Sequence, residues 1–281
     1  MKTFLLPENF SPDSKLTLGG EDFHYLTRVL RLRAGDTFSG TDRRGKRYLL
    51  RIVETGETTL AVAADSPGPS LLSDTEVFGD TGSSPASNSP SSNSPSSNPL
   101  PEIHLFQSLL KGRKMDGLVR QAVEAGVHRF IPVRSEYTIP VYDRDKEEKK
   151  RRRWEAIVRE AVQQSGSPII TEVAETIELS EIKNIFNNDL GLFFHHEPLE
   201  QSPLHRYLSL YPKRVAIAIG PEGGFSPGEV EELRSAGFSP VHLHTNVLRA
   251  ETAAVYALGA VQTIITERAF WEPKTVNPPG L

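Results

Sequence analysis

The sequence predicts an α/β protein, in which a mostly parallel sheet with helices on both faces follows a small antiparallel β-barrel. Residues 1–72 contain short alternating segments separated by turn residues, as in small antiparallel barrels. After residue 100 the pattern changes to apolar strands that alternate with segments of helical period, as in parallel sheets. The chain of 281 residues also exceeds what one small core needs, so two domains are expected.

The composition is that of an ordinary globular protein, with 37% apolar residues, 24% charged residues and a formal net charge of −4. No apolar run approaches the roughly 20 residues that span a bilayer. The N-terminal apolar stretch breaks at Pro7, too early for a secretory signal, so we expect a cytoplasmic protein without a membrane segment. Cysteine is absent, which excludes disulfides, thiolate metal sites and cysteine nucleophiles.

The first domain is predicted to span residues 1–73. Its alternating segments predict strands at residues 36–40, 47–54 and 59–63. One helix is expected over residues 22–32, with Phe23, Leu26, Val29 and Leu30 on its buried face.

A linker is predicted at residues 74–99. Residues 84–98 repeat a five-residue pattern of Ser, Pro and Asn that offers no side chain for a core. Such a tract cannot offset its own ordering entropy, so we interpret it as flexible, with a docking tail as the alternative.

The second domain is predicted to span residues 100–281. Strands are expected at residues 103–106, 129–133, 190–195, 215–219 and 241–243. Helical spacing runs from Met115 to Gly126 and around Trp154 to Gly166. The last helix, residues 251–266, is apolar nearly all round, so it should be buried against the sheet or against another subunit.

The stretch IGPEGGF, residues 219–225, joins a buried strand to a helix whose start carries a Ser226–Glu229 capping box. In open α/β sheets ligands bind at this edge. The stretch lacks the lysine of a phosphate-binding loop, and Glu222 would repel a pyrophosphate. A neutral or cationic ligand pressed against the bare backbone of Gly223 and Gly224 fits better, and a tight turn without a ligand is the alternative.

Two further polar segments follow strands. Arg249 and Glu251 stand at the start of the apolar last helix, where charges are costly unless they are paired or used. An Arg–Glu pair that seals the helix end is the alternative to a functional role. His195 and His196 end another strand, but no third ligand has a recognisable spacing, so polar residues at the edge of a site are favoured over zinc.

Five motifs in order resemble the RsmE family, the bacterial 16S rRNA uridine N3-methyltransferases of the SPOUT superfamily. They are HYLTRVLRLRAGD, LLKGRKMDGLVRQAVEAGV, REAVQQSG, IGPEGGFSPGEVE and LRAETAA. The resemblance covers both domains and omits the Ser/Pro/Asn insertion. It departs from the family at His244 (commonly Gly), Ala250 (Thr), Gln163 (Glu) and Thr3 (Arg).

The resemblance implies an N-terminal PUA-like β-barrel and a C-terminal SPOUT-type α/β methyltransferase domain with a trefoil knot. It also implies S-adenosyl-L-methionine as cofactor, 16S rRNA of the small ribosomal subunit as substrate and a homodimer. We expect three loops to converge into a cleft without lysine that holds the cofactor. The cofactor-binding residues carried over are Phe194, His195, His196, Ile219, Gly220, Pro221, Glu222, Gly223, Gly224, Leu243, Asn246, Val247, Leu248, Thr252 and Ala253.

Methyl transfer to uracil N3 requires alignment of donor and acceptor and stabilisation of the anionic base. Arg249 is our hypothesis for the residue that stabilises this charge at O2 or O4. Glu222 and Glu251 are candidate general bases, or they position Arg249 or the ribose. No metal is expected.

RNA binding is predicted for a basic stretch in the first domain. Residues 28–51 carry eight Lys or Arg against two Asp, a balance of +6, which suits phosphate contacts, with a solvated surface as the alternative. The predicted contacts are Arg28, Arg31, Arg33, Arg43, Arg44, Lys46 and Arg47. For the second basic run, residues 149–153, we favour a solvated surface.

Three other functions compete with this interpretation. Another RNA methyltransferase with the same knot would methylate a different atom. A non-catalytic RNA-binding assembly factor would not bind the cofactor. An NAD-dependent oxidoreductase lacks its glycine fingerprint here.

Overall fold

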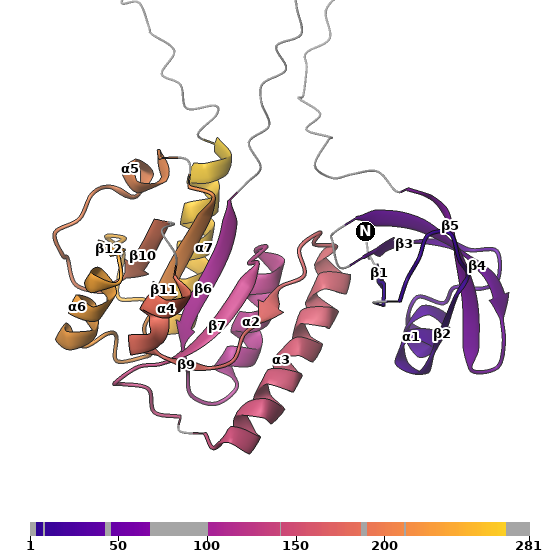
Figure 1. Ribbon diagram of the computed structural model, residues 1–281, viewed down its shortest axis with the longest axis horizontal. Coiled ribbons are helices and arrows are strands. Elements are labelled where there is room, and N and C mark those ends of the chain that lie inside the picture. The colour runs from indigo at the N-terminus through magenta and orange to yellow at the C-terminus, as the bar shows by residue number, and fades with distance from the viewer. Residues whose placement is uncertain are drawn as a thin grey trace, which may run out of the picture.

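The structure is a computed structural model, and it describes residues 4–7, 9–42, 46–67, 101–140, 142–186, 190–210 and 212–267. The predicted linker at residues 74–99 lies outside these ranges, as do Thr3, Arg43 and Arg44. Figure 1 shows two bodies, an N-terminal sheet domain and a C-terminal α/β domain, with helix α3 (Arg144–Ser165) nearest to the first.

The N-terminal domain is a five-stranded sheet in the order β1-β3-β4-β5-β2. Its edge strands do not pair with each other in the described residues, so the expected barrel is a half-barrel. Apolar side chains alternate along the strands; Leu50, Ile52, Leu60 and Val62 are buried in one core. The strands are β1 (Phe4–Leu5), β2 (Leu16–Gly19), β3 (Thr37–Thr41), β4 (Arg47–Thr55) and β5 (Thr59–Pro67).

The helix that covers this core differs from the prediction. It begins as α1 (Gly20–His24) and continues as a π-helical segment, Tyr25–Val29. The Leu30 N–H donates to the Tyr25 carbonyl, a bond over five residues that widens the turn. Leu26 therefore stays buried, whereas Val29 is 54% exposed, contrary to the face expected for a regular helix.

The C-terminal domain has a seven-stranded sheet in the order β12-β10-β11-β6-β7-β8, with β9 also paired to β7. All of its strand pairs are parallel, which confirms the predicted class. The trefoil knot implied by the resemblance stays a prediction. The strands are β6 (Glu102–Ser108), β7 (Arg129–Arg134), β8 (Glu172–Val173), β9 (Ile177–Glu178), β10 (Leu190–Phe194), β11 (Arg214–Ile219) and β12 (Phe238–Val241).

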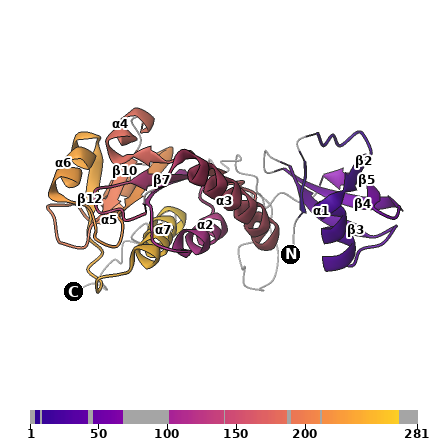
Figure 2. The ribbon, with the colours of Figure 1, turned by 90° about the horizontal axis from the view of Figure 1, so that it is seen from below.

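Helices cover both faces of this sheet because the strands are apolar on both sides. In β11, Ile217 belongs to one core and its neighbour Ala218 to the other. Figure 2 shows α2 and α7 on one side of the sheet and α4 and α6 on the other. The helices are α2 (Lys114–Glu124), α3, α4 (Ile182–Ile185), α5 (Leu204–Leu208), α6 (Pro227–Ser235) and α7 (Ala250–Glu267), with a 3₁₀ turn at Leu179–Glu181.

Several predicted boundaries differ from the structure; for example, β5 runs on to Pro67, where a strand is predicted at residues 59–63. Strand β12 ends at Val241, where residues 241–243 had been expected, and it contains Pro240. A proline is tolerated there because β12 is an edge strand. Helix α3 starts ten residues before Trp154, at Arg144, where the Asp143 carboxylate caps the Lys146 N–H at 2.9 Å.

The first domain contacts the end of α3. The guanidinium of Arg47 donates a hydrogen bond to the carbonyl of Gly166, the residue that follows α3. Arg47 is therefore used in a contact between the domains, a role that its charge alone did not predict.

Two histidines have shifted pKa values: His104 in β6 and His128 immediately before β7. Burial, and the nearby Arg214, lower the pKa of His104 to about 4. Burial also lowers the pKa of His128, whose Nδ1 accepts a hydrogen bond from the Ile103 N–H at 3.1 Å. At neutral pH the His104 ring is therefore uncharged, and its 3.7 Å contact with Glu102 is not an ion pair.

We expect these histidines to make stability depend on pH. The unfolded chain takes up protons below about pH 6.5, whereas folded His104 takes one up only near pH 4. Stability should therefore be full above about pH 6.5 and fall as the pH drops toward 4, by at most about 3 kcal/mol from His104. Urea midpoints between pH 7.5 and 4.5 should fall less for His104→Gln than for the wild type. An identical pH dependence of the two proteins would contradict this assignment.

Candidate functional site

The ends of three adjacent strands meet at one edge of the C-terminal sheet. Phe194, the last residue of β10, is in register with Ile219 at the end of β11 and with Val241 at the end of β12. The loops after them enclose a cavity of about 560 Å³, within the range of small-molecule sites, which we call the strand-end cavity. It is lined by Lys114, Phe194, His195, His196, Ile219, Gly220, Pro221, Glu222, Gly223, Gly224, Val241, His242, Leu243, Thr245, Asn246, Val247, Leu248, Arg249, Ala250 and Ala253.

The loop after β11 presents main chain to this cavity. The Gly224 N–H donates to the Pro221 carbonyl at 2.9 Å and closes a tight turn. A Cβ on Gly220 would lie 3.0 Å from the carbonyl carbon of Gly224, which is tighter than most Cβ contacts and would require the main chain to shift. Gly224 has φ 73°, and a Cβ there would meet His196 at 3.1 Å. The turn therefore requires glycine at both positions.

The start of α6 holds this loop in place. Ser226 and Glu229 form the predicted capping box, with bonds of 3.3 and 2.9 Å between each side chain and the other's N–H. The same Glu229 carboxylate accepts the Glu136 N–H at 2.7 Å, which ties in the loop after β7. Within this loop, the Ser135 N–H donates to the Thr138 hydroxyl at 3.0 Å.

The cavity contains a lysine, so the expected lysine-free cleft is wrong. Lys114 begins α2, and its ammonium lies 3.1 Å from Glu222 Oε1 and 3.3 Å from Glu251 Oε2. The hydrogen bond to Glu222 raises the pKa of Lys114, and Glu251 acts in the same direction. The lysine comes from a segment more than 100 residues before its partners, which is why the loop sequence did not reveal it.

Glu222 is held as a carboxylate. Burial alone would raise its pKa, but hydrogen bonds from its own N–H, from Lys114 and from the Lys111 N–H outweigh burial, so the pKa lies below its ordinary value. The Lys111 N–H is 3.3 Å from Glu222 Oε1. A carboxylate with this pKa is ionised at neutral pH and already has several donors.

Arg249 is exposed at the cavity wall and forms no ion pair within the described ranges. The alternative of an Arg249–Glu251 pair sealing the helix end is therefore wrong, because Glu251 pairs with Lys114 instead. Glu251 Oε2 is fully buried and has no aligned hydrogen-bond donor within the described part of the chain.

Histidines line the other wall. The rings of His195 and His196 lie 4.7 Å apart, and His242 Nδ1 is 3.2 Å from the His195 carbonyl. Over the ranges that the structure covers, no group of three His, Cys, Asp or Glu could hold a metal ion. His195, His196 and His242 all line the cavity.

The structure brings together nearly all of the predicted site residues. Every predicted cofactor-binding residue lines the cavity except Thr252, which is exposed. Of the candidate catalytic residues, Arg249 and Glu222 line it, and Glu251 lies beside it through Lys114. Residues that the sequence prediction missed are Lys114, Val241, His242, Thr245 and Ala250.

His244 explains one departure from the family pattern. Its φ is 49°, in the left-handed region that favours glycine, and the related family commonly has glycine there. Histidine tolerates this conformation better than most residues, and the His244 ring packs edge-on against His242 at 4.8 Å.

The predicted RNA-binding residues lie in the first domain. Arg28, Arg31 and Arg33 are exposed and have no ion pair within the described part of the chain. Lys46 lies 5.3 Å from the centre of the Tyr48 ring, and Arg47 is used by the domain contact. Arg43 and Arg44 lie outside the described residues.

Comparisons with known proteins agree with this geometry. A family model described as an RNA methyltransferase domain matches residues 96–262, and one described as an RNA methyltransferase PUA domain matches residues 18–63. The chain is 37% identical over 161 residues to ribosomal RNA small subunit methyltransferase E of Aquifex aeolicus, covering 56% of this chain and 66% of that protein. The Bacillus subtilis protein of that name is 30% identical over 166 residues, covering 57% and 65%. These two alignments span slightly less than two thirds of the relatives.

A solved structure covers nearly the whole chain. Ribosomal RNA small subunit methyltransferase E of Neisseria gonorrhoeae, bound to S-adenosyl methionine, is 25% identical with a TM-score of 0.71. The match covers 94% of this chain and 98% of that one. Within the described residues, none of the helices has the length and apolar character to cross a membrane.

Proposed function

Since this chain belongs to the ribosomal RNA small subunit methyltransferase E family, we propose that it transfers a methyl group from S-adenosyl-L-methionine to N3 of a uridine in 16S rRNA. The observation that carries the proposal is the convergence of the β10, β11 and β12 ends on one cavity walled by bare glycine backbone.

The cavity fits the cofactor. Gly220 and Gly224 line the cavity and let the turn fold tightly against itself and His196, so main-chain groups form this wall, which suits a flat adenine ring and a ribose. Apolar walls from Phe194, Ile219 and Leu248 suit the ring. When bound, S-adenosyl-L-methionine supplies an activated methyl group on a sulfonium, and the ionised Glu222 carboxylate is compatible with that positive charge.

Arg249 is the proposed residue that stabilises the base. Uracil N3 gives up its proton to solvent water before it accepts the methyl group, and the negative charge that this leaves on O2 and O4 can be neutralised by a guanidinium. Arg249 lines the same cavity and has no carboxylate partner within the described ranges, so its charge is available. Neither Glu222 nor Glu251 is free as a general base, because Lys114 binds both.

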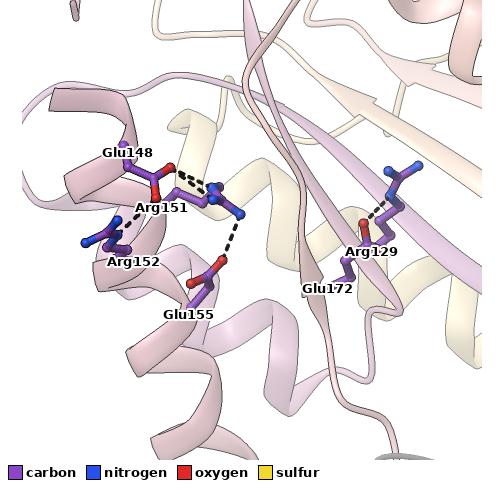
Figure 3. A network of polar contacts seen from close by, with 6 residues as sticks. All are labelled: Arg129, Glu148, Arg151, Arg152, Glu155 and Glu172. Carbon is purple, nitrogen blue, oxygen red and sulfur yellow. Dashed lines mark hydrogen bonds and ion pairs between the residues drawn. The ribbon is translucent and has the colours of Figure 1, made fainter. Parts of the chain in front are cut away.

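The rRNA phosphates are proposed to bind the exposed arginines of the first domain. The guanidinium groups of Arg28, Arg31 and Arg33 form no ion pair in the part of the chain that is described, so they can neutralise phosphates. The basic run on α3 differs. Figure 3 shows Glu148 bonded to Arg151 and Arg152, at 2.9 Å each, and Glu155 bonded to Arg151. These internal pairs support the solvated surface that we favoured for α3.

Charge reversal in the first domain should weaken RNA binding. For Arg31→Glu combined with Arg33→Glu, we expect a smaller slope of log Kd against log salt, by roughly 1 for each lost phosphate contact. Cofactor affinity should not change, because both residues lie in the other domain. Filter binding of small-subunit rRNA fragments at several salt concentrations measures the slope.

The matched control reverses two charges on α3, Lys149→Glu with Arg152→Glu. This variant has the same change in net charge and should keep the wild-type slope. Equal salt slopes for the wild type and both variants would count against phosphate contacts in the first domain. A smaller salt slope in the α3 variant alone would assign the phosphate contacts to α3.

A homodimer is part of the proposal. Helix α7 buries Ala254, Leu258 and Val261 in the core, but it leaves Val255 37% and Tyr256 48% exposed. A second copy of the chain would cover this apolar face. The ribosomal substrate would place the protein in the cytoplasm.

The test of the function uses labelled S-adenosyl-L-methionine and small ribosomal subunits that lack the modification. Incorporation of label, followed by digestion, should yield N3-methyluridine as the labelled nucleoside. A different methylated nucleoside would indicate another RNA methyltransferase. No cofactor binding in a calorimetric titration would indicate a non-catalytic RNA-binding protein.

A further inference from the structure

Lys114 and Arg249 are the two permanently charged cations among the described residues that line the strand-end cavity. Their surroundings differ. Lys114 contacts two carboxylates from two other segments, Glu222 in the loop after β11 and Glu251 in α7. Arg249, two residues before Glu251 in the chain, has neither carboxylate as a partner.

The geometry points to Lys114 as a positioning residue that holds Glu222 and Glu251 away from Arg249, so that the Arg249 guanidinium stays available to the RNA base. The inference rests on the proposed function, because it assumes that Arg249 meets an anionic base.

Electrostatics support this division of partners. Without Lys114, two carboxylates would remain beside the cavity, one of them with the fully buried oxygen Glu251 Oε2. A buried charge left unpaired is costly, so it recruits the nearest available cation. Arg249 is the other lysine or arginine that lines this cavity among the described residues, so we infer that it is the cation recruited. Capture of its guanidinium would remove it from the base.

Lys114 is placed for this task by its own segment. It is the first residue of α2, and the Lys111 N–H three residues earlier also donates to Glu222 Oε1. The start of α2 therefore supplies both an ammonium and a main-chain donor to the loop after β11. One side chain thus links three segments that line or border the cavity.

The first test replaces Lys114 by methionine, which keeps the length of the side chain and removes its charge. We expect affinity for a uridine-containing rRNA fragment to fall about 10-fold, and kcat to fall by at least as much. Lys114→Arg should keep most of both, because arginine retains the charge. Lys183→Met makes the same change in charge on α4, at an exposed position that does not line the cavity, and is the matched control, with little effect expected.

A double-mutant cycle separates action through Arg249 from a direct contact with RNA. In the Arg249→Ala background, Lys114→Met should cause no further loss of RNA affinity. Adding Glu251→Gln to Lys114→Met should restore affinity, because it removes the carboxylate that captures Arg249. The cycle is measured as RNA affinity and not as turnover, because Glu251→Gln can lower turnover by itself.

Additive losses in the cycle, or wild-type affinity and turnover for Lys114→Met, would overturn the inference. Unchanged thermal midpoints of the variants confirm that they fold. If the wild-type protein itself transfers no methyl group, the proposed function fails, and that result is distinct from a failure of the Lys114 assignment.

Discussion

Replacing Arg249 by alanine is expected to lower kcat about 100-fold or more, with cofactor affinity little changed. One well-placed charge at a developing anion contributes on this scale. Arg249 is exposed at the cavity wall, and no carboxylate of the described residues pairs with it. Replacing Arg249 therefore breaks no structural ion pair and affects the interaction with the substrate. Initial rates at saturating small subunits and saturating cofactor measure the effect.

The control for this variant is Arg206→Ala, which removes an exposed arginine of α5 that does not line the cavity. It should keep wild-type turnover. Near wild-type kcat for Arg249→Ala with saturating RNA would mean that another group stabilises the base. A rise in KM for RNA with kcat unchanged would instead assign Arg249 to substrate binding.

The sheet could be predicted where strands are buried on both faces. β10 and β11 are nearly continuous apolar runs, and β6 contains the apolar residues Ile103, Leu105 and Phe106, so the pattern of the chain located these strands. β8 and β9 have two residues each and leave no period to detect. The π-helical segment was missed because residues 22–32 have an acceptable α-helical period, and no local pattern marks the wider turn that leaves Leu26 buried and Val29 exposed.

The site could be predicted as far as its residues are contiguous in the chain. The loops after β10, β11 and β12 carry their own glycines and polar residues, and parallel strands bring their ends to one edge. The partners of Glu222 and Glu251 could not be deduced in this way. A pair between Lys114 and Glu222 depends on how β6 and β11 lie side by side, and no local pattern contains that information.

The glycine turn is the second feature with a large expected effect. We expect Gly220→Ala to abolish detectable cofactor binding, at least a 100-fold loss of affinity, while the protein stays folded. Gly220 is fixed between the end of β11 and the turn at Gly224, and an added Cβ would lie 3.0 Å from the Gly224 carbonyl carbon and 3.2 Å from its Cα. Main-chain atoms cannot rotate aside, so the turn itself must shift, and this turn is part of the cavity wall.

Isothermal titration with S-adenosyl-L-methionine measures this loss, with circular dichroism and a thermal midpoint as the test of folding. Gly117→Ala is the matched control, because a Cβ at that helical position meets nothing within 4 Å. It should bind normally and gain roughly 0.5–1 kcal/mol of stability from its better helix propensity. Normal binding by Gly220→Ala would mean that the cofactor does not depend on this turn. The glycine turn from Gly220 to Gly224 would then no longer support the assignment of the strand-end cavity as the cofactor site.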